Sequence, residues 1–214
     1  GVGVKVDWVD SPSFSLLTHL YVVNGFADGQ EDPLDDTGLG SSGYPSFGSL
    51  SSTADNNDNK AIGGRIAMKF AGGMVSLGAS GYYGQWTDQD LDAKNLLIYG
   101  TDAQLRFSAT ELRAGLALMN VDLLSGDHSA RTGGYLEYGQ KFGAKSPFKV
   151  LIRTGALQMD DRVVDANDQT WVGATFLWQP GPIQLSLEHS RDIQLSIPGK
   201  ANTNYTIARF VLAQ

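Results

Sequence analysis

The stretch Phe148-Lys149-Val150-Leu151-Ile152-Arg153-Thr154-Gly155-Ala156 decides the fold class. Phe148, Val150, Ile152 and Ala156 fall on one side of the alternation, and the charged Lys149 and Arg153 fall on the other. A period of two is typical of a β-strand with one apolar and one polar face. We therefore predict a strand here, with its basic side chains on the face opposite the apolar ones.

The same alternation recurs along the chain, and no comparable segment has the helical period of about 3.6 residues. It predicts an all-β chain of eleven strands, at 2–9, 14–24, 60–70, 74–85, 96–107, 111–120, 132–142, 148–157, 170–179, 183–191 and 205–214. Most have about ten residues, enough for a tilted strand to cross a bilayer and longer than the ~5–6 residues usual in soluble sheets.

The connections between these strands alternate in length. Short ones at 10–13, 71–73, 108–110, 143–147 and 180–182 alternate with longer ones at 25–59, 86–95, 121–131, 158–169 and 192–204. Antiparallel strands place alternate connections at opposite ends, so one end should carry tight turns and the other long loops. We predict a single domain over 1–214, a transmembrane antiparallel up-and-down β-barrel of a bacterial outer membrane. A soluble β-sandwich also fits the alternation and stays open as an alternative.

Strand parity bears on the size of this barrel. Bacterial single-chain barrels have an even number of strands. We therefore expect at least one further strand before Gly1, and about eleven visible strands of a barrel of 12 to 16. The connection at 25–59 is predicted to be a long extracellular loop, which either folds into the barrel as a constriction or stays at the solvated surface.

The charges are distributed unevenly over the predicted elements. The chain has 16 Lys+Arg against 23 Asp+Glu and a net charge of −7, which disfavours a nucleic-acid partner. The long loops hold 17 of the acids and four bases, whereas the strands and short turns hold 12 bases and six acids. A charge facing lipid near the midplane costs ~2–4 kcal/mol, so we expect strand charges to point inward.

The predicted pore-lining residues are therefore mainly basic. They are Lys5, Arg65, Lys69, Arg106, Arg113, Glu137, Lys141, Lys149, Arg153 and Arg191, with Asp7, Asp102, Glu111 and Glu188 as acidic neighbours. Rings of Lys and Arg favour anions, which predicts an anion-preferring pore. The open alternative is that these bases and acids pair across neighbouring strands and leave the pore nearly unselective.

Residues for chemistry or metal binding are sparse. The chain has no Cys, so disulfides, thiolate zinc sites and covalent haem attachment are excluded within it. Asp55–Asn59 begins like a calcium loop, but Lys60 stands where that motif needs Gly. His19, His128 and His189 are isolated in the sequence. We expect no catalytic residue, metal site or cofactor, and looser calcium binding by the acidic loops stays open.

Several short strings resemble the phosphate-selective porin family. They are Tyr21–Gly25, Asp58–Arg65, Leu77–Tyr83, Tyr99–Ala103 and Glu111–Arg113, in a resemblance that runs from about residue 14 to the end. This resemblance implies an outer-membrane channel of sixteen strands, often a homotrimer, in which phosphate or other anions pass a basic constriction.

Together these features predict an outer-membrane porin for passive diffusion of small hydrophilic or anionic solutes, surrounded by outer-membrane lipid and lipopolysaccharide. A second hypothesis is a porin-like sheath or scaffold for an envelope partner such as a multihaem cytochrome. A third is a soluble β-rich binding module.

Overall fold

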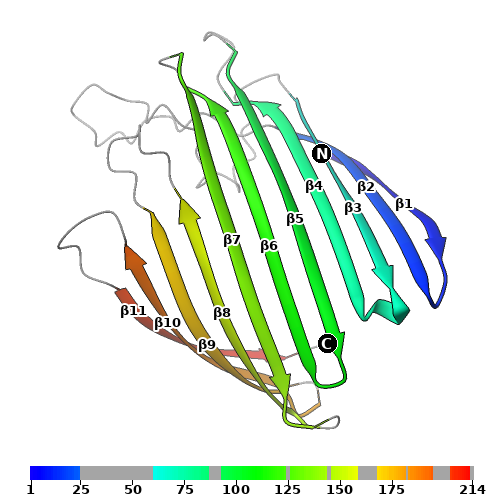
Figure 1. Ribbon diagram of the computed structural model, residues 1–214, viewed down its shortest axis with the longest axis vertical. Coiled ribbons are helices and arrows are strands. Elements are labelled where there is room, and N and C mark those ends of the chain that lie inside the picture. The colour runs from blue at the N-terminus through cyan, green and yellow to red at the C-terminus, as the bar shows by residue number, and fades with distance from the viewer. Residues whose placement is uncertain are drawn as a thin grey trace.

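The computed structural model describes residues 1–24, 60–86, 93–123, 126–143, 146–158, 168–181, 183–194 and 203–212. They form one antiparallel sheet whose strands follow one another in chain order (Figure 1). The strands are β1 (Val2–Asp10), β2 (Phe14–Asn24), β3 (Lys60–Phe70), β4 (Val75–Gln85), β5 (Asn95–Phe107), β6 (Thr110–Asp122), β7 (His128–Lys141), β8 (Phe148–Gln158), β9 (Gln169–Trp178), β10 (Ile183–Gln194) and β11 (Thr203–Leu212), with a short 3-10 turn, η1 (Ala71–Gly73), after β3. The predicted all-β, up-and-down antiparallel architecture is confirmed.

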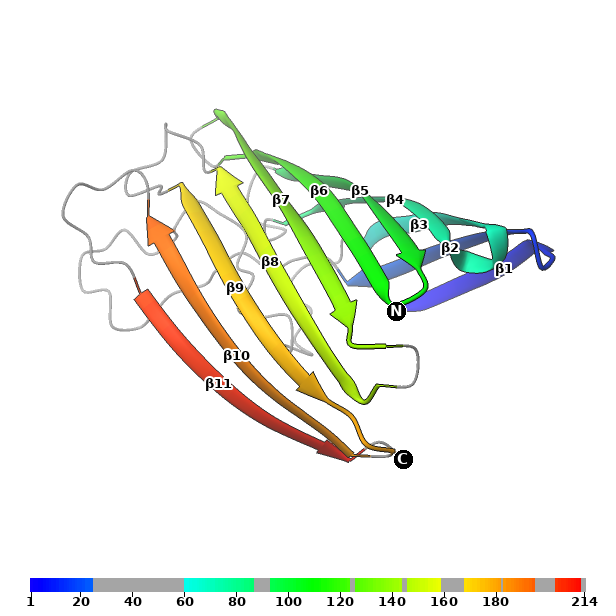
Figure 2. The same cartoon turned by 60° about the horizontal axis from the view of Figure 1, so that its bottom comes forward.

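The sheet is long and strongly curved (Figure 2). Within the described residues, β1 and β11 form its two edges, and each of them pairs with a single neighbour. No helix in this part of the chain is long and apolar enough to span a membrane. The loop predicted at 25–59, including the calcium-like Asp55–Asn59, lies outside the described residues.

The prediction of a loop over 121–131 is wrong, because the pairing of β6 with β7 continues to Asp122, which lies opposite His128. Polar hydrogen bonds hold this extension: the His128 ring donates to the Asp122 carboxylate at 2.7 Å, and the Asn95 side-chain amide donates to the same carboxylate at 2.9 Å. Only 123–127 separates the two strands, so this connection is about as short as the one over 142–147 at the opposite end. The strict alternation of short and long connections fails here.

The two faces of the sheet differ sharply in composition. One cross-strand row runs through Lys5, His19 and Arg65, on the face that we call the polar face. The adjacent row through Val4 and Leu20 lies on the opposite, apolar face. A bulge interrupts β1 between Asp7 and Val9. The pairings of the other strands have no such interruption, so each of those strands keeps its alternation along its whole length.

Burial is the reverse of that in a soluble sheet. On the polar face Ser190 and Glu188 are only 1% and 8% exposed, whereas on the apolar face Ile152 and Leu187 are 50% and 54% exposed. Side chains converge on the concave side of a curved sheet, so this burial places the polar face there. Among the described elements, the backbones that lie close together belong to strands adjacent in the sheet, or to η1 and its neighbours. A β-sandwich needs a second layer over the apolar face, and the described strands supply none.

Aromatic rings on the polar face lie over glycines of the neighbouring strand. Tyr21 is opposite Gly63, Tyr135 is opposite Gly115, and Trp171 is opposite Gly155. A Cβ added to Gly155 would lie 2.6 Å from the Trp171 ring, and the other two pairs are equally tight. The absence of a side chain therefore lets each ring lie flat within the curve of the sheet.

We predict that Gly155→Ala destabilises the protein by about 1–3 kcal/mol, because the new methyl group overpacks against Trp171. Gly133→Ala is the matched control on the same face, since its Cβ would sit 3.5 Å from Leu157, an ordinary contact. Denaturant unfolding followed by tryptophan fluorescence measures both variants. Equal stability of the two would contradict the proposed ring-over-glycine packing.

Candidate functional site

Charged side chains from six strands form a connected network on the polar face, which we call the charged ladder. Its members are Arg106, Glu111, Arg113, Glu137, Lys149, Arg153, Glu188 and Arg209. The ladder extends from β5 to β11, and all eight residues fall on the polar face by strand register.

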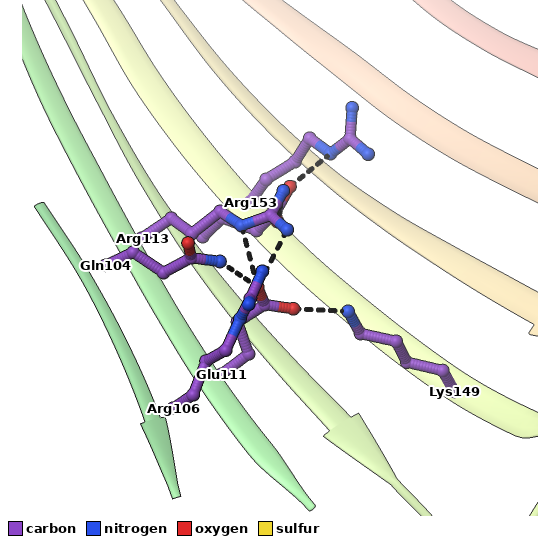
Figure 3. Close-up of polar contacts among 7 residues, drawn as sticks. Gln104, Arg106, Glu111, Arg113, Lys149 and Arg153 are labelled. Carbon is purple, nitrogen blue, oxygen red and sulfur yellow. Dashed lines mark hydrogen bonds and ion pairs between the residues drawn. The ribbon is translucent and has the colours of Figure 1, made fainter. Parts of the chain in front are cut away.

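Glu111, near the start of β6, is the most densely bonded acid of the ladder (Figure 3). Its Oε1 accepts hydrogen bonds from Arg113 Nη2 at 2.7 Å and from Arg106 Nε at 3.2 Å. Its Oε2 accepts one from Lys149 Nζ at 2.7 Å, and the Gln104 amide also donates to this carboxylate. One recessed carboxylate thus holds three cations from three strands, β5, β6 and β8.

Two further carboxylates continue the ladder toward β11. Glu137 lies 3.5 Å from Arg113 Nη1 and 3.7 Å from Arg153 Nε. Glu188 lies 3.8 Å from Arg153 Nη1 and 3.7 Å from Arg209 Nη2. Acids and bases therefore alternate in space. Such pairing of charges across strands is what the alternative of a nearly unselective pore predicted.

The ladder nevertheless presents a basic surface, because it contains five cations and three carboxylates. The carboxylates are also recessed: the Glu111 side chain is 13% exposed, against 57% for Arg106. The described strands as a whole place ten bases and seven acids on this face. A solute at the polar face therefore meets guanidinium and ammonium groups first.

Several ion pairs pass over an intervening strand. Arg65 on β3 makes a bidentate pair with Asp102 on β5, with donor–acceptor distances of 2.6 and 2.8 Å, across Gly78 of β4. Lys149 on β8 reaches Glu111 on β6 across β7, where a Cβ at Gly139 would lie 2.8 Å from Lys149 Cε. These bridges need the curvature of the sheet and a glycine beneath them.

The remaining predicted pore residues lie outside the ladder. Lys5 is 3.8 Å from Asp7, with both side chains largely exposed. Lys69 and Lys141 form no ion pair with any described residue, and both are exposed near the short turns. A polar hollow of about 440 Å³ opens beside these turns, with Lys69, Gln104 and Arg106 in its wall.

Nine of the ten predicted residues share the polar face, and Arg191 does not. Arg191 lies opposite Val172 on β9 and Asn204 on β11, in the rows of the apolar face. The prediction of a shared face is wrong for this residue. Arg191 is two residues from His189 and four from Leu187, so all three lie on the apolar face of β10, and the adjacent Ser190 lies on the polar face. Counting in twos along β10 from Leu185 would have given the correct face.

Two further residues, Arg209 and Gln104, contribute to the contacts of the charged ladder and were not among the predicted residues. Arg209 precedes the outward Phe210 on β11, so alternation alone could have placed it on the polar face. Gln104 is uncharged and carried no signal in the sequence for its hydrogen bond to Glu111.

The loop end of the polar face holds a buried apolar cluster on and beside β4, β5 and β6. Trp86, Leu96 and Val121 form a cluster there, each about 1% exposed, and Trp86 Nε1 donates to the Asp122 carbonyl at 3.1 Å. The charged ladder and the free lysines thus lie toward the turn end, and an apolar cluster lies toward the loop end.

Among the described residues, no group of three or more His, Asp or Glu side chains could hold a metal ion. No protein-family model matches this chain, and no curated protein matches it. The resemblance to phosphate-selective porins therefore stays a prediction.

We predict that Gly78→Ala separates Arg65 from Asp102, because a Cβ there would meet both side-chain tips. A double-mutant cycle with Arg65→Gln and Asp102→Asn should give a coupling of about 0.5–1 kcal/mol in the wild type and near zero in Gly78→Ala. Gly81→Ala on the same strand, where a Cβ would meet nothing within 4 Å, should keep the coupling. An unchanged coupling in Gly78→Ala would contradict the role of this glycine.

Proposed function

We propose that this chain forms the wall of a bacterial outer-membrane porin, through which small hydrophilic solutes diffuse passively with a preference for anions. The observation that carries the proposal is the exposed apolar face opposite a crowded, charged one. Leu136, Ile152 and Leu187 are each at least 50% exposed on adjoining parts of that face. An exposed apolar surface of this extent calls for an apolar surrounding, and lipid is the surrounding that a curved antiparallel sheet fits.

A lipid surrounding also requires that the sheet close into a barrel. The outer edges of β1 and β11 carry backbone N–H and C=O groups without partners among the described strands. Such groups cost several kcal/mol each in hydrocarbon, so membrane-spanning sheets are closed. In the proposed porin both edges are paired and the concave polar face encloses the water-filled path.

Aromatic side chains at the turn end of the apolar face agree with this placement. Phe148 packs against Phe176 and Trp178, with ring centroids 5.6 and 6.3 Å apart. Phe14 and Phe70 form a similar pair on β2 and β3, with centroids 5.2 Å apart. Aromatic girdles of this kind mark the membrane–water interface in barrels.

The preference for anions rests on the excess of cations in the charged ladder and on the free lysines beside it. The recessed carboxylates fix the guanidinium groups in place but do not neutralise them fully. Lys69 and Lys141 add two positive charges near the turn end, where all solutes would pass. Such rings of basic side chains favour anions electrostatically, without a binding or chemical step.

The reversal potential of single channels in a planar bilayer, measured across a salt gradient, tests this function. We expect the wild-type protein to conduct with a preference for chloride over potassium. The double variant Lys69→Glu/Lys141→Glu should shift the preference toward cations, because it changes the sign of both free charges. The control Lys69→Arg/Lys141→Arg keeps the charges and should keep the preference for anions.

A wild-type protein that gives no conductance would contradict the porin itself. A clear preference for cations in the wild type would contradict only the proposed selectivity.

A further inference from the structure

We propose that the apolar face binds a phosphorylated glycolipid, whose acyl chain lies in a diagonal groove and whose phosphate contacts Arg191. This inference rests on the proposed function, because it needs the apolar face to meet lipid. It assigns a site on the lipid-facing side of the sheet, separate from the charged ladder.

The apolar part of the site is an open groove of about 880 Å³ that crosses β4 to β9. Small side chains form its floor, among them Ala103, Ala114 and Ala156, and the larger Leu116 and Leu136 form its sides. A chain of methylene groups fits such a surface, because it can contact the small residues along its whole length.

The groove is inclined to the strands. It begins at Leu77, two residues from the turn end of β4, and finishes at Thr170, one residue from the loop end of β9. In a barrel the long loops face outward from the cell, so the groove would run from the periplasmic side of the bilayer up to the headgroups of the outer leaflet. Thr154, Gln158 and Thr170 line its end on β8 and β9, which we call the polar end, and Thr101 and Asp102 line it nearer β4.

Arg191 stands beside that polar end. Arg191 lies opposite Val172, and Thr170 is two residues from Val172 on the same face of β9. A side chain as long as that of Arg191 can span the diagonal from its own position to Thr170. Arg191 is exposed and forms no ion pair with any described residue. The described residues therefore supply no ionic partner for this guanidinium.

Neutral hydrogen-bonding groups surround Arg191 on the same face. Asn204 lies directly opposite it on β11, and the His189 ring is hydrogen-bonded to the Thr206 hydroxyl at 3.0 Å. A guanidinium pairs with phosphate in a bidentate manner, and amides and hydroxyls bind sugar hydroxyls. This chemistry favours a phosphorylated sugar headgroup over the smaller headgroup of a phospholipid.

Native mass spectrometry of protein released from detergent micelles tests the site, with lipid A bisphosphate as the probe. We expect the wild type to retain the probe. It should retain dephosphorylated lipid A, phosphatidylglycerol and inorganic phosphate less strongly than the probe. Arg191→Gln should weaken retention about tenfold, as expected for loss of a charge-assisted hydrogen bond, and Arg191→Lys should weaken it less.

Matched controls separate the site from general effects. Arg209→Gln removes the same charge from the polar face of the neighbouring strand and should keep retention. Ala156→Leu fills the groove and should weaken retention, whereas Ala79→Leu adds the same bulk on the apolar face outside the groove and should not.

Equal retention by wild type and Arg191→Gln would overturn the proposal, as would retention of phosphatidylglycerol equal to that of lipid A. The proposal would also be overturned if Ala156→Leu retains lipid A but no longer forms oligomers. That result would identify the groove as a contact between copies of the chain. Conductance of the same wild-type preparation tests the proposed function separately: a conducting protein without retained glycolipid refutes this site alone.

Discussion

The exposed apolar face is the constraint on which the rest of the structure depends. A two-residue period gives every strand two unlike faces, and the curvature of the sheet then decides which face is crowded. Here the crowded side is the charged one, where Glu188 is almost buried, while Ile152 on the other side is half exposed. In water this arrangement would leave the apolar side hydrated, which the hydrophobic effect disfavours.

The charged ladder is a consequence of that arrangement. Charges excluded from one face accumulate on the other, and a concave face brings them within reach of one another. Carboxylates lie at the base and longer basic side chains extend over them, because Lys and Arg stems can pass across a neighbouring strand. Glycines such as Gly78 and Gly139 leave the room for these crossings. The high glycine content thus serves the polar face as well as the turns.

Most of the fold could be predicted from the sequence, because alternation is local. The eleven strands, their antiparallel order and the face of nine of the ten predicted residues follow from it. The extension of β6 and β7 to Asp122 and His128 could not be predicted, since polar hydrogen bonds replace apolar alternation there. The ladder could be predicted only in part: pairs such as Lys149–Glu111 join strands that are not neighbours, and their contact depends on the curvature.

Site-directed labelling along β8 tests the central claim most directly. The chain has no Cys, so each introduced cysteine is unique, and a spin label can be placed at every position from 149 to 155 of protein reconstituted in lipid vesicles. We expect lipid-soluble oxygen to relax labels at Val150, Ile152 and Thr154, and a water-soluble nickel reagent to relax labels at Lys149, Leu151 and Arg153. Access of the nickel reagent to both sets of positions, or to neither, would contradict the central claim.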